Sequence, residues 1–323
     1  MSFFRRLAGR KPPRSLPPVL DPSHGDEELR RLRALAEAGD WAALRPALAA
    51  VADQAELTWL LNRITDVEGT EEWLAKAVAE RPEDTLVLLV SGARHISWAW
   101  NARTGARAKD VTEEGWRLFG ERLETAEEQL LEVAEREPGW LAPWYFLQIG
   151  ARGASLGRTV ATTRFDAALR RDPGHLASHQ QRLQQLCAKW GGSHEEMHAF
   201  ARTAMLGAPE GSPLGELVAV AHLEHWLDLP DGEDHAYLTG PAVRTSLREA
   251  ALRSVLHPAY RPRRDWRTTH NTFAMVLSLA DERELAHAVF ATLGDAATDW
   301  PWYYLGGDEA ENFGLHRDRC APR

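Results

Sequence analysis

Apolar residues recur every three or four positions along most of this chain. Leu29, Leu32 and Leu35 begin the pattern, and polar or charged residues fill most of the positions between them. The Gly39-Asp40 pair then interrupts the pattern before it resumes. This periodicity places apolar side chains on one face of a helix, and a Gly-Asp pair is typical of a tight turn. The sequence therefore predicts a helix-turn-helix hairpin over residues 26–52.

The same alternation of helix and turn continues to residue 292. No segment has the convincing period-two alternation that is typical of a β-strand. We therefore expect an all-α protein made of seven hairpins, with consecutive helices antiparallel. The predicted helices cover residues 26–38, 41–52, 56–64, 70–80, 85–101, 112–137, 141–151, 159–171, 175–190, 193–206, 213–227, 241–256, 266–280 and 282–292.

Prolines close several of these helices and indicate a repeat length. Pro138, Pro173 and Pro209 lie 35 and 36 residues apart, and a period in this range is typical of helical solenoids. The helix before Pro173 has small, aromatic and small residues at the offsets of a tetratricopeptide repeat, namely Ala161, Phe165 and Ala168. On these residues the chain resembles the tetratricopeptide-repeat proteins. The resemblance implies antiparallel hairpins stacked as a tetratricopeptide-like α-solenoid.

Composition changes at both ends of the repeat region. Residues 1–22 are rich in proline and basic residues and predict a disordered lead-in. Residues 23–296 contain the predicted helical repeats. Residues 297–323 form a predicted cap and tail, because an aromatic cluster near their start could cover the last hairpin. This cluster consists of Trp300, Trp302, Tyr303 and Tyr304.

Charge and cysteine content narrow the class of protein. The net charge is −9, and the first fourteen residues carry +5, so the rest of the chain carries −14 and is a poor match for a nucleic-acid backbone. No apolar run is long enough to span a membrane. Cys187 and Cys320 offer no disulfide framework. We therefore expect a cytoplasmic protein that binds no nucleic acid.

The segment from Lys189 to His198 supports two interpretations. In the first, Gly191-Gly192 forms a turn, and Ser193 followed by Glu196 is a capping box that begins a helix. The segment is then a joint between two helices. Its Lys-Trp-Gly-Gly-Ser-His-Glu block resembles a group of actinobacterial proteins of unknown function built on helical repeats. That resemblance implies the fold and no activity.

In the second interpretation, the segment is a zinc site. His194-Glu195-Glu196-Met197-His198 fits the H-E-x-x-H pattern, in which two histidines bind zinc and Glu195 acts as the general base. Antiparallel packing would bring further ligands to the same edge, while His175 and His179 would lie about 24 Å away. The structural alternative is a set of helix-end histidines bonded to carboxylates. The further candidate ligands are His222, Glu224, His225 and His235.

Thirteen tryptophans are an unusually large number for this length. Aromatic side chains at helix ends either pack between repeats or line the concave groove of a solenoid, where they anchor bound peptides. Our leading hypothesis is a non-enzymatic scaffold that binds a protein or peptide partner without a cofactor. The alternative is a metal-binding protein or zinc-dependent hydrolase. The predicted groove residues are Trp98, Trp100, Trp144, Tyr145, Trp190 and Trp226.

Basic residues form one further candidate feature. Arg261, Arg263 and Arg264 lie in a predicted loop between the last two hairpins. Such a loop could grip a phosphate or an acidic peptide, or it could simply be solvated. The sequence contains neither a phosphate-binding G-x-x-x-x-G-K-[ST] motif nor a G-x-S-x-G nucleophile motif. The motifs therefore indicate no enzymatic activity beyond the zinc alternative.

Overall fold

A computed structural model of the protein describes residues 17–105, 108–230 and 232–322. Within these ranges the protein is all-α, as predicted: seventeen α-helices account for the regular structure apart from short 3-10 turns and two strands of two residues each. All fourteen predicted helices are confirmed, with ends that agree to within a few residues. The periodic pattern of apolar residues therefore predicted the helices correctly.

The first half of the described chain contains strand β1 and seven α-helices. Their bounds are β1 Val19–Leu20, α1 Glu27–Glu37, α2 Trp41–Ala49, α3 Gln54–Ile64, α4 Thr70–Glu80, α5 Thr85–Arg103, η1 Ala108–Asp110, α6 Glu113–Arg136 and α7 Ala142–Gly153. The 3-10 turns carry the label η. The second half continues with α8 Gly157–Leu169, α9 Leu176–Leu186, η2 Ala188–Trp190, α10 His194–Gly207, η3 Pro213–Gly215, α11 Glu216–Leu227, α12 Asp234–Leu238, α13 Pro241–Arg253, α14 Trp266–Leu279, α15 Arg283–Leu293, β2 Ala296–Ala297, α16 Asp299–Trp302, η4 Tyr303–Leu305 and α17 Glu309–Cys320.

The structure differs from the predicted elements in a few places. The helix expected over 175–190 ends at Leu186, because Cys187 adopts an extended backbone conformation before η2. Helices α12, α16 and α17 were not predicted. Only Phe313 and Cys320 of α17 are buried, so its apolar pattern is weak. The strands were not predicted either, since two residues are too few to show alternation.

Local capping fixes the starts of several helices. The side chains of Asp26, Asp40, Asp53 and Thr112 accept hydrogen bonds from backbone N–H groups in the first turns of α1, α2, α3 and α6. Each such cap stabilises a helix by about 1 kcal/mol. These four helix starts therefore depend on short-range sequence signals alone.

Packing between neighbours in the sequence builds two hydrophobic cores. Consecutive helices contact each other closely in the pairs α5–α6, α7–α8, α10–α11 and α14–α15. One core is formed by buried residues of α1 to α7, and the other by buried residues of α9 to α17. Burying one leucine side chain stabilises the fold by roughly 1.5–3 kcal/mol. The apolar faces of the predicted hairpins therefore account for both cores.

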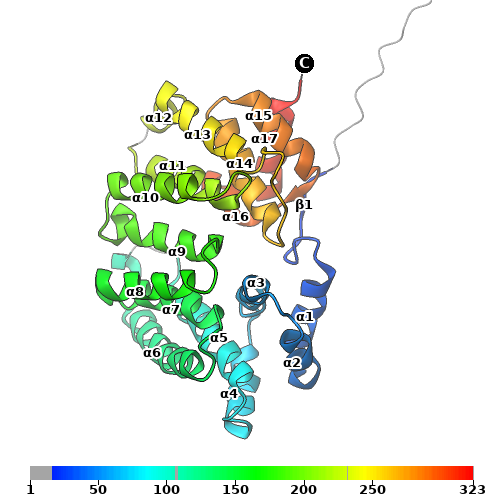
Figure 1. Ribbon diagram of the computed structural model, residues 1–323, viewed down its shortest axis with the longest axis vertical. Coiled ribbons are helices and arrows are strands. Elements are labelled where there is room, and N and C mark those ends of the chain that lie inside the picture. The colour runs from blue at the N-terminus through cyan, green and yellow to red at the C-terminus, as the bar shows by residue number, and fades with distance from the viewer. Residues whose placement is uncertain (1–16, 106–107, 231, 323) are drawn as a thin grey trace, which may run out of the picture.

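The two ends of the described chain lie side by side (Figure 1). Strands β1 and β2 pair in parallel, with Val19 opposite Ala296. Arg264, just before α14, forms ion pairs with Asp26 at 3.0 Å and with Glu28. Of the predicted lead-in, residues 1–16 lie outside the described residues, whereas residues 17–22 include β1. The N-terminal helices are thus joined directly to the C-terminal half.

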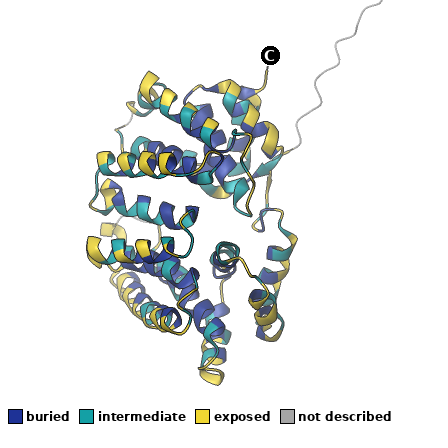
Figure 2. Ribbon diagram, viewed as in Figure 1, coloured by how far each residue is buried: buried dark blue, intermediate teal, exposed yellow. Residues whose placement is uncertain are grey.

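Helix α3 has an interior position. It contacts α1, α5 and α7, and none of its residues is exposed (Figure 2). Leu57, Leu60 and Leu61 fill the first core, while the opposite side of the helix faces the second half of the molecule. This position brings polar residues of α3 near residues that are more than a hundred positions away in the sequence.

The aromatic segment near the C-terminus packs on the last predicted hairpin. Helices α16 and α17 contact α14 and α15. The Trp302 side chain is fully buried, and its indole N–H donates a 2.7 Å hydrogen bond to Asn271 Oδ1. No helix in the described part of the chain is both long and apolar enough to cross a membrane.

Candidate functional site

The segment from Lys189 to His198 is a capped joint between helices. Gly191 has a φ of +84°, a left-handed conformation that glycine adopts readily. The Ser193 hydroxyl oxygen accepts a 3.1 Å hydrogen bond from the Glu196 backbone N–H, and α10 begins at His194. The Glu196 carboxylate forms an exposed ion pair with Arg158. The predicted Ser193 cap is therefore confirmed, whereas the Glu196 side chain bonds to Arg158 and does not complete a capping box.

The four histidines named in the zinc alternative do lie together. The His194 ring stacks on the His225 ring, with centroids 3.9 Å apart and an angle of 4° between the planes. His198 Nε2 lies 3.1 Å from His225 Nδ1. The His222 ring lies 4.7 Å from the His198 ring. We call His194, His198, His222 and His225 the histidine cluster.

Other side chains hold the histidine cluster in place. The Tyr237 hydroxyl lies 2.8 Å from His222 Nδ1 and 3.3 Å from His198 Nε2. The Ser246 hydroxyl lies 3.0 Å from His222 Nε2, and His194 Nε2 lies 3.1 Å from an Asp228 carboxylate oxygen. The sequence did not indicate Tyr237, which lies in the unpredicted helix α12. His235 of the same helix is exposed, and no contact of it with the cluster is found among the described residues.

Burial keeps His198 and His222 of the histidine cluster uncharged at neutral pH. It lowers the pKa of His198 to about 4 and that of His222 to about 3, and the neighbouring histidines add to both effects. Burial also lowers the pKa of His225. An imidazole removed from water holds a proton less well, because its charged form is poorly solvated. The cluster therefore consists mainly of neutral rings bonded to one another.

The geometry of the cluster differs from that of a catalytic zinc site. Such a site needs three protein ligands directed at one point and an open position for water. His194 and His225 are stacked, so their nitrogen lone pairs lie in parallel planes. Among residues 17–105, 108–230 and 232–322, no three His, Cys, Asp or Glu side chains form a group that could hold a metal ion. Glu195, the base in that alternative, is exposed on α10.

Glu224 belongs to a different contact network. Its carboxylate accepts hydrogen bonds from Lys189 Nζ at 2.7 Å and Gln184 Nε2 at 2.6 Å. The Tyr304 hydroxyl donates a longer bond of 3.4 Å to the same carboxylate. Glu224 is buried, so these donors are needed to stabilise its charge. The network joins the Lys189 block to α11 and to the C-terminal aromatic segment.

The six predicted groove residues do not form one surface. Trp100 and Trp190 contact each other edge to face at 5.9 Å. Trp98 packs under the guanidinium group of Arg122 at 3.5 Å. Trp144 lies under Arg171, and Trp226 packs against the second core. Tyr145 is the member of this set that lines the cavity described next.

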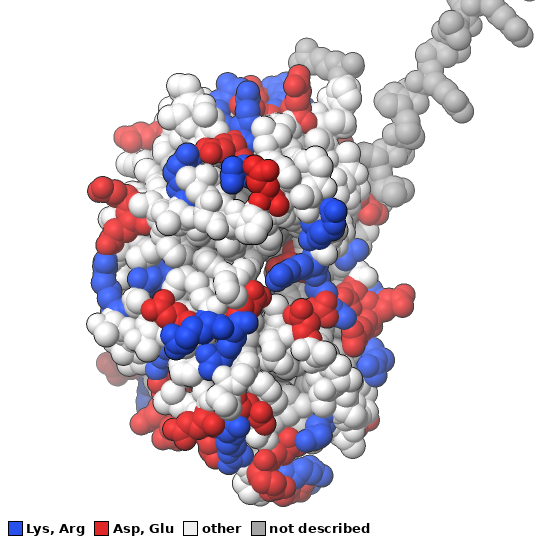
Figure 3. All heavy atoms as spheres, viewed as in Figure 1, with Lys and Arg blue, Asp and Glu red and all other residues white. Residues whose placement is uncertain are grey.

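A cavity lies between the two halves of the molecule, and we call it the central cavity. It encloses about 640 Å³ between atoms, including the part that is open to solvent. On the face of the molecule in Figure 3, acidic and basic side chains are interspersed. The residues that line the cavity come from α3, α7, the start of α9 and the segment before α14. They include Asp53, Glu56, Trp59, Asn62, Tyr145, His175, Leu176, Ala177, Pro213, Arg263, Arg264 and Asp265.

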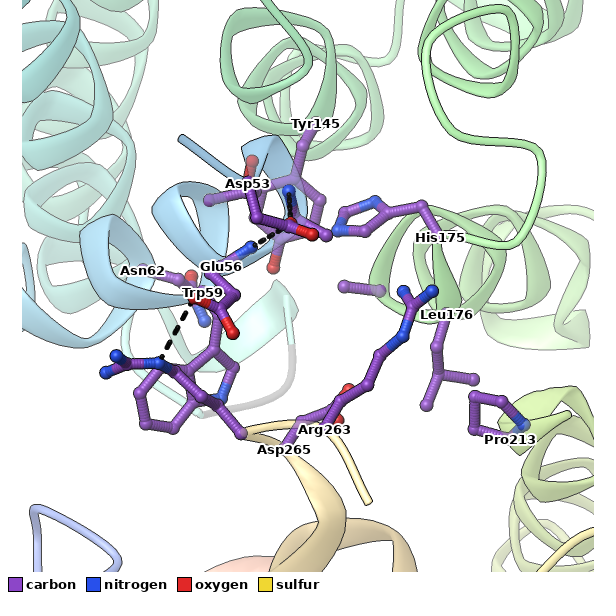
Figure 4. A pocket seen from close by; sticks show the side chains of 14 residues that line it. Asp53, Glu56, Trp59, Asn62, Tyr145, His175, Leu176, Pro213, Arg263 and Asp265 are labelled. Carbon is purple, nitrogen blue, oxygen red and sulfur yellow. Dashed lines mark hydrogen bonds and ion pairs between the residues drawn. The ribbon is translucent and has the colours of Figure 1, made fainter. Parts of the chain in front are cut away.

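Figure 4 shows how these side chains face one another. Asp53, Glu56 and Trp59 come from α3 and its N-cap, and they face His175 and Leu176 at the start of α9. Local sequence patterns indicated little of this site, because its two sides meet only through tertiary packing. The basic loop of residues 261–264 was the one local signal near it.

Internal ion pairs neutralise part of the charge in the central cavity. Arg264 is bound by Asp26 and Glu28, and it lies 3.6 Å from Glu56. Arg263 is half exposed and lies 3.5 Å from an Asp172 oxygen. The predicted basic loop is therefore held by the protein's own carboxylates, and Arg264 is held most firmly.

Two polar groups in the central cavity keep an unused hydrogen-bonding atom. Only 5% of His175 is exposed, and its Nδ1 accepts a 3.3 Å hydrogen bond from the Ser178 backbone N–H, which places the proton on Nε2. No described residue bonds to His175 Nε2. Asp265 likewise has no side-chain donor in the described part of the chain, and burial raises the pKa of its carboxyl group. Both atoms are available to a bound molecule.

The fold and the cavity define an all-α protein with a polar and aromatic cavity between its two halves. No known protein family, no curated protein and no solved structure matches this chain.

Proposed function

We propose that this protein is a non-enzymatic, tetratricopeptide-like α-solenoid that binds a segment of a protein or peptide partner in its central cavity. The repeat assignment is supported by consecutive packed helix pairs and by Ala161, Phe165 and Ala168, which are buried together on α8. Small and aromatic residues at these offsets let neighbouring helices approach closely. We also propose that this chain is related to the actinobacterial group that has the Lys-Trp-Gly-Gly-Ser-His-Glu block.

The central cavity is the observation that carries the proposed function. Aromatic Trp59 and Tyr145 line it together with apolar Leu176 and polar groups that lack internal partners. Binding sites combine an apolar surface with a few polar groups that fix the orientation of the ligand. The enclosed part of this space is small, so it suits a side chain rather than a folded domain. An inserted peptide segment therefore fits better than a globular partner.

Several observations support a binding protein over an enzyme. The histidine cluster is closed by its own contacts, and Glu195 lies in solvent outside it. Both cysteines are buried free thiols, and burial raises the pKa of the Cys187 thiol to about 12, which suppresses the reactive thiolate. Free thiols also fit the proposed cytoplasmic location.

The experiment that tests the function is selection from a random peptide library. We expect the full chain to select peptides whose binding is lost in Ala177→Trp, because the indole ring would fill the cavity from α9. Ala288→Trp on the exposed face of α15 is the matched control and should bind as the wild type does. Selected peptides that bind both variants equally well would contradict the proposal.

The zinc alternative has its own test. We expect protein purified without an affinity tag to contain no stoichiometric zinc, because the lone pairs of the histidine cluster do not converge. Calorimetric titration with Zn²⁺ should show no binding tighter than the millimolar range. Micromolar binding that His198→Ala abolishes would instead support the metal-binding alternative.

A further inference from the structure

We propose that the central cavity recognises a basic partner segment by taking up a lysine or arginine side chain. This inference rests on the proposed function and adds the chemistry of the ligand. It is carried by three features of the cavity, which are unpaired carboxylate oxygens, aromatic rings and a buried N–H donor without a partner.

The carboxylates provide a negative environment that internal contacts leave incomplete. Asp53 Oδ1 accepts the backbone N–H groups of Ala55 and Glu56 at 2.8 and 3.0 Å, while Oδ2 accepts no hydrogen bond from the described residues. Asp265 has no cationic side chain within ion-pair distance in that part of the chain. Glu56 is paired with Arg264. Asp53 is exposed, whereas burial raises the pKa of the Asp265 carboxyl group, so a cation that enters beside Asp265 would stabilise its ionised form.

The aromatic side chains suit the same ligand. Trp59 and Tyr145 line the cavity from α3 and α7, and aromatic faces attract ammonium and guanidinium groups. The His175 ring contacts Tyr145 edge to face at 5.8 Å. Burial lowers the pKa of His175 to about 4, so the imidazole is neutral near pH 7 and does not repel a cation. A basic side chain can therefore lie against rings and between carboxylates.

His175 provides a separate contact for the backbone of the segment. Its Nδ1 is used by Ser178, so the proton is on Nε2, which lines the cavity as a donor. The ring is nearly inaccessible to solvent and is fixed at the N-cap of α9. A free amine or metal cation offers no acceptor for this N–H group, whereas a peptide carbonyl does. The combination of groups therefore favours a basic peptide over a simple cation.

Arg263 and Arg264 both line the cavity and oppose a cationic ligand, but Arg264 is paired with three carboxylates. The less firmly held Arg263 therefore provides a test of the sign of the ligand's charge. Its guanidinium group is half exposed, and its contact with Asp172 is long, at 3.5 Å. The side chain can therefore turn away when a ligand enters. Removing its charge should strengthen the binding of a basic segment. Removing the charge of Asp265 should weaken it. An acidic ligand would reverse both effects.

The experiment uses the tightest peptide that binds wild type but not Ala177→Trp, with affinities measured by calorimetry on the full chain. We expect the selected peptides to be enriched in Lys and Arg. Replacing one of these residues by Gln should weaken binding roughly tenfold. Asp265→Asn should also weaken binding roughly tenfold, and Arg263→Gln should strengthen it a few-fold. Glu284→Gln, on exposed α15, is the control for general surface charge and should have no effect.

Two kinds of failure are distinguishable. Cavity-dependent peptides that are rich in acidic or purely apolar residues, or that bind Asp265→Asn more tightly, would overturn this inference and leave the proposed function standing. If no peptide distinguishes wild type from Ala177→Trp, the proposed function itself fails. Thermal unfolding of Asp265→Asn and Arg263→Gln checks that both variants are folded before their affinities are compared.

Discussion

The histidine cluster and the central cavity are two polar regions of this molecule that differ in how many of their hydrogen-bonding atoms have partners. In the cluster, His222 uses both ring nitrogens, and His198 bonds to His225 and Tyr237. In the cavity, His175 Nε2 and Asp265 keep free bonding capacity. In the cluster, His194 Nδ1 is a buried nitrogen without a hydrogen-bond partner among the described residues. The cavity differs because it offers both a free donor and a free carboxylate to a ligand.

The two regions also differ in how they are assembled. The histidine cluster joins α10 to α13, which are neighbours in sequence. The cavity joins α3 to the start of α9 and to residues 263–265, and it depends on the contact between the two ends of the chain. A cluster within adjacent hairpins contributes to packing, whereas a space between distant elements can accommodate a partner.

The largest expected effect is a loss of stability in the helix joint next to the histidine cluster. A Cβ atom on Gly192 would lie 2.0 Å from the Leu186 carbonyl oxygen, so the backbone must shift. We expect Gly192→Ala to lower the free energy of unfolding by about 3 kcal/mol or more. Gly191→Ala meets no neighbouring atom and should cost only about 1 kcal/mol for its left-handed backbone. Urea unfolding measures both, and equal losses would contradict the close packing of this joint.

A second prediction concerns the pH dependence of the cluster. The pKa of His222 is about 3 in the folded protein, below the ordinary value of 6.5. The unfolded state therefore binds the proton first, so the stability contributed above pH 6.5 is lost as the pH falls toward 3. Between pH 7 and 5, we expect the free energy of unfolding of the wild type to fall by an amount on the order of 2 kcal/mol because of His222. The His222→Gln variant should not show this fall. If the free energies of unfolding of the two proteins change with pH in the same way, His222 is solvated in the folded protein.

Sequence reasoning predicted the regular structure well and the cavity poorly, for a physical reason. Helix periodicity and helix caps such as Ser193 depend on residues a few positions apart, so a short stretch of sequence is enough to recognise them. Antiparallel packing even placed His198 near His225 correctly. The approach of Trp59 to His175 depends on how α3 sits between the two halves, and no local pattern encodes that position. The six predicted groove residues missed the cavity except for Tyr145, because ring contacts or arginines hold four of the others and Trp226 packs against the second core.

A third prediction concerns the contact between the chain ends, which frames the cavity. We expect Arg264→Met to lower the free energy of unfolding by about 1 kcal/mol, because three carboxylates lose their shared partner. Arg263→Met removes one long contact from a half-exposed side chain and should change stability by less than about 0.5 kcal/mol. Urea unfolding of the two variants gives the comparison. A larger loss of stability for Arg263→Met than for Arg264→Met would show that Arg263, and not Arg264, holds the chain ends together.

The smallest expected effect is in the cavity itself. Burial raises the pKa of Asp265, so its ionised form destabilises the folded state at neutral pH. Asp265→Asn should leave the stability at pH 7 unchanged or raise it by about 0.5 kcal/mol, and the gain should vanish as the pH falls and the carboxyl group becomes protonated. Chemical unfolding at the two pH values measures this. A clear loss of stability would mean that Asp265 has a structural role.

The central claim is that partners bind at the cavity and not at the histidine cluster. Hydrogen–deuterium exchange of the full chain, with and without a library-selected peptide, tests it most directly. We predict added protection in α3, at the start of α9 and over residues 263–265, with no change in α10, α11 or α12. Protection centred on α10, α11 and α12 would contradict the account and make the histidine cluster the binding site.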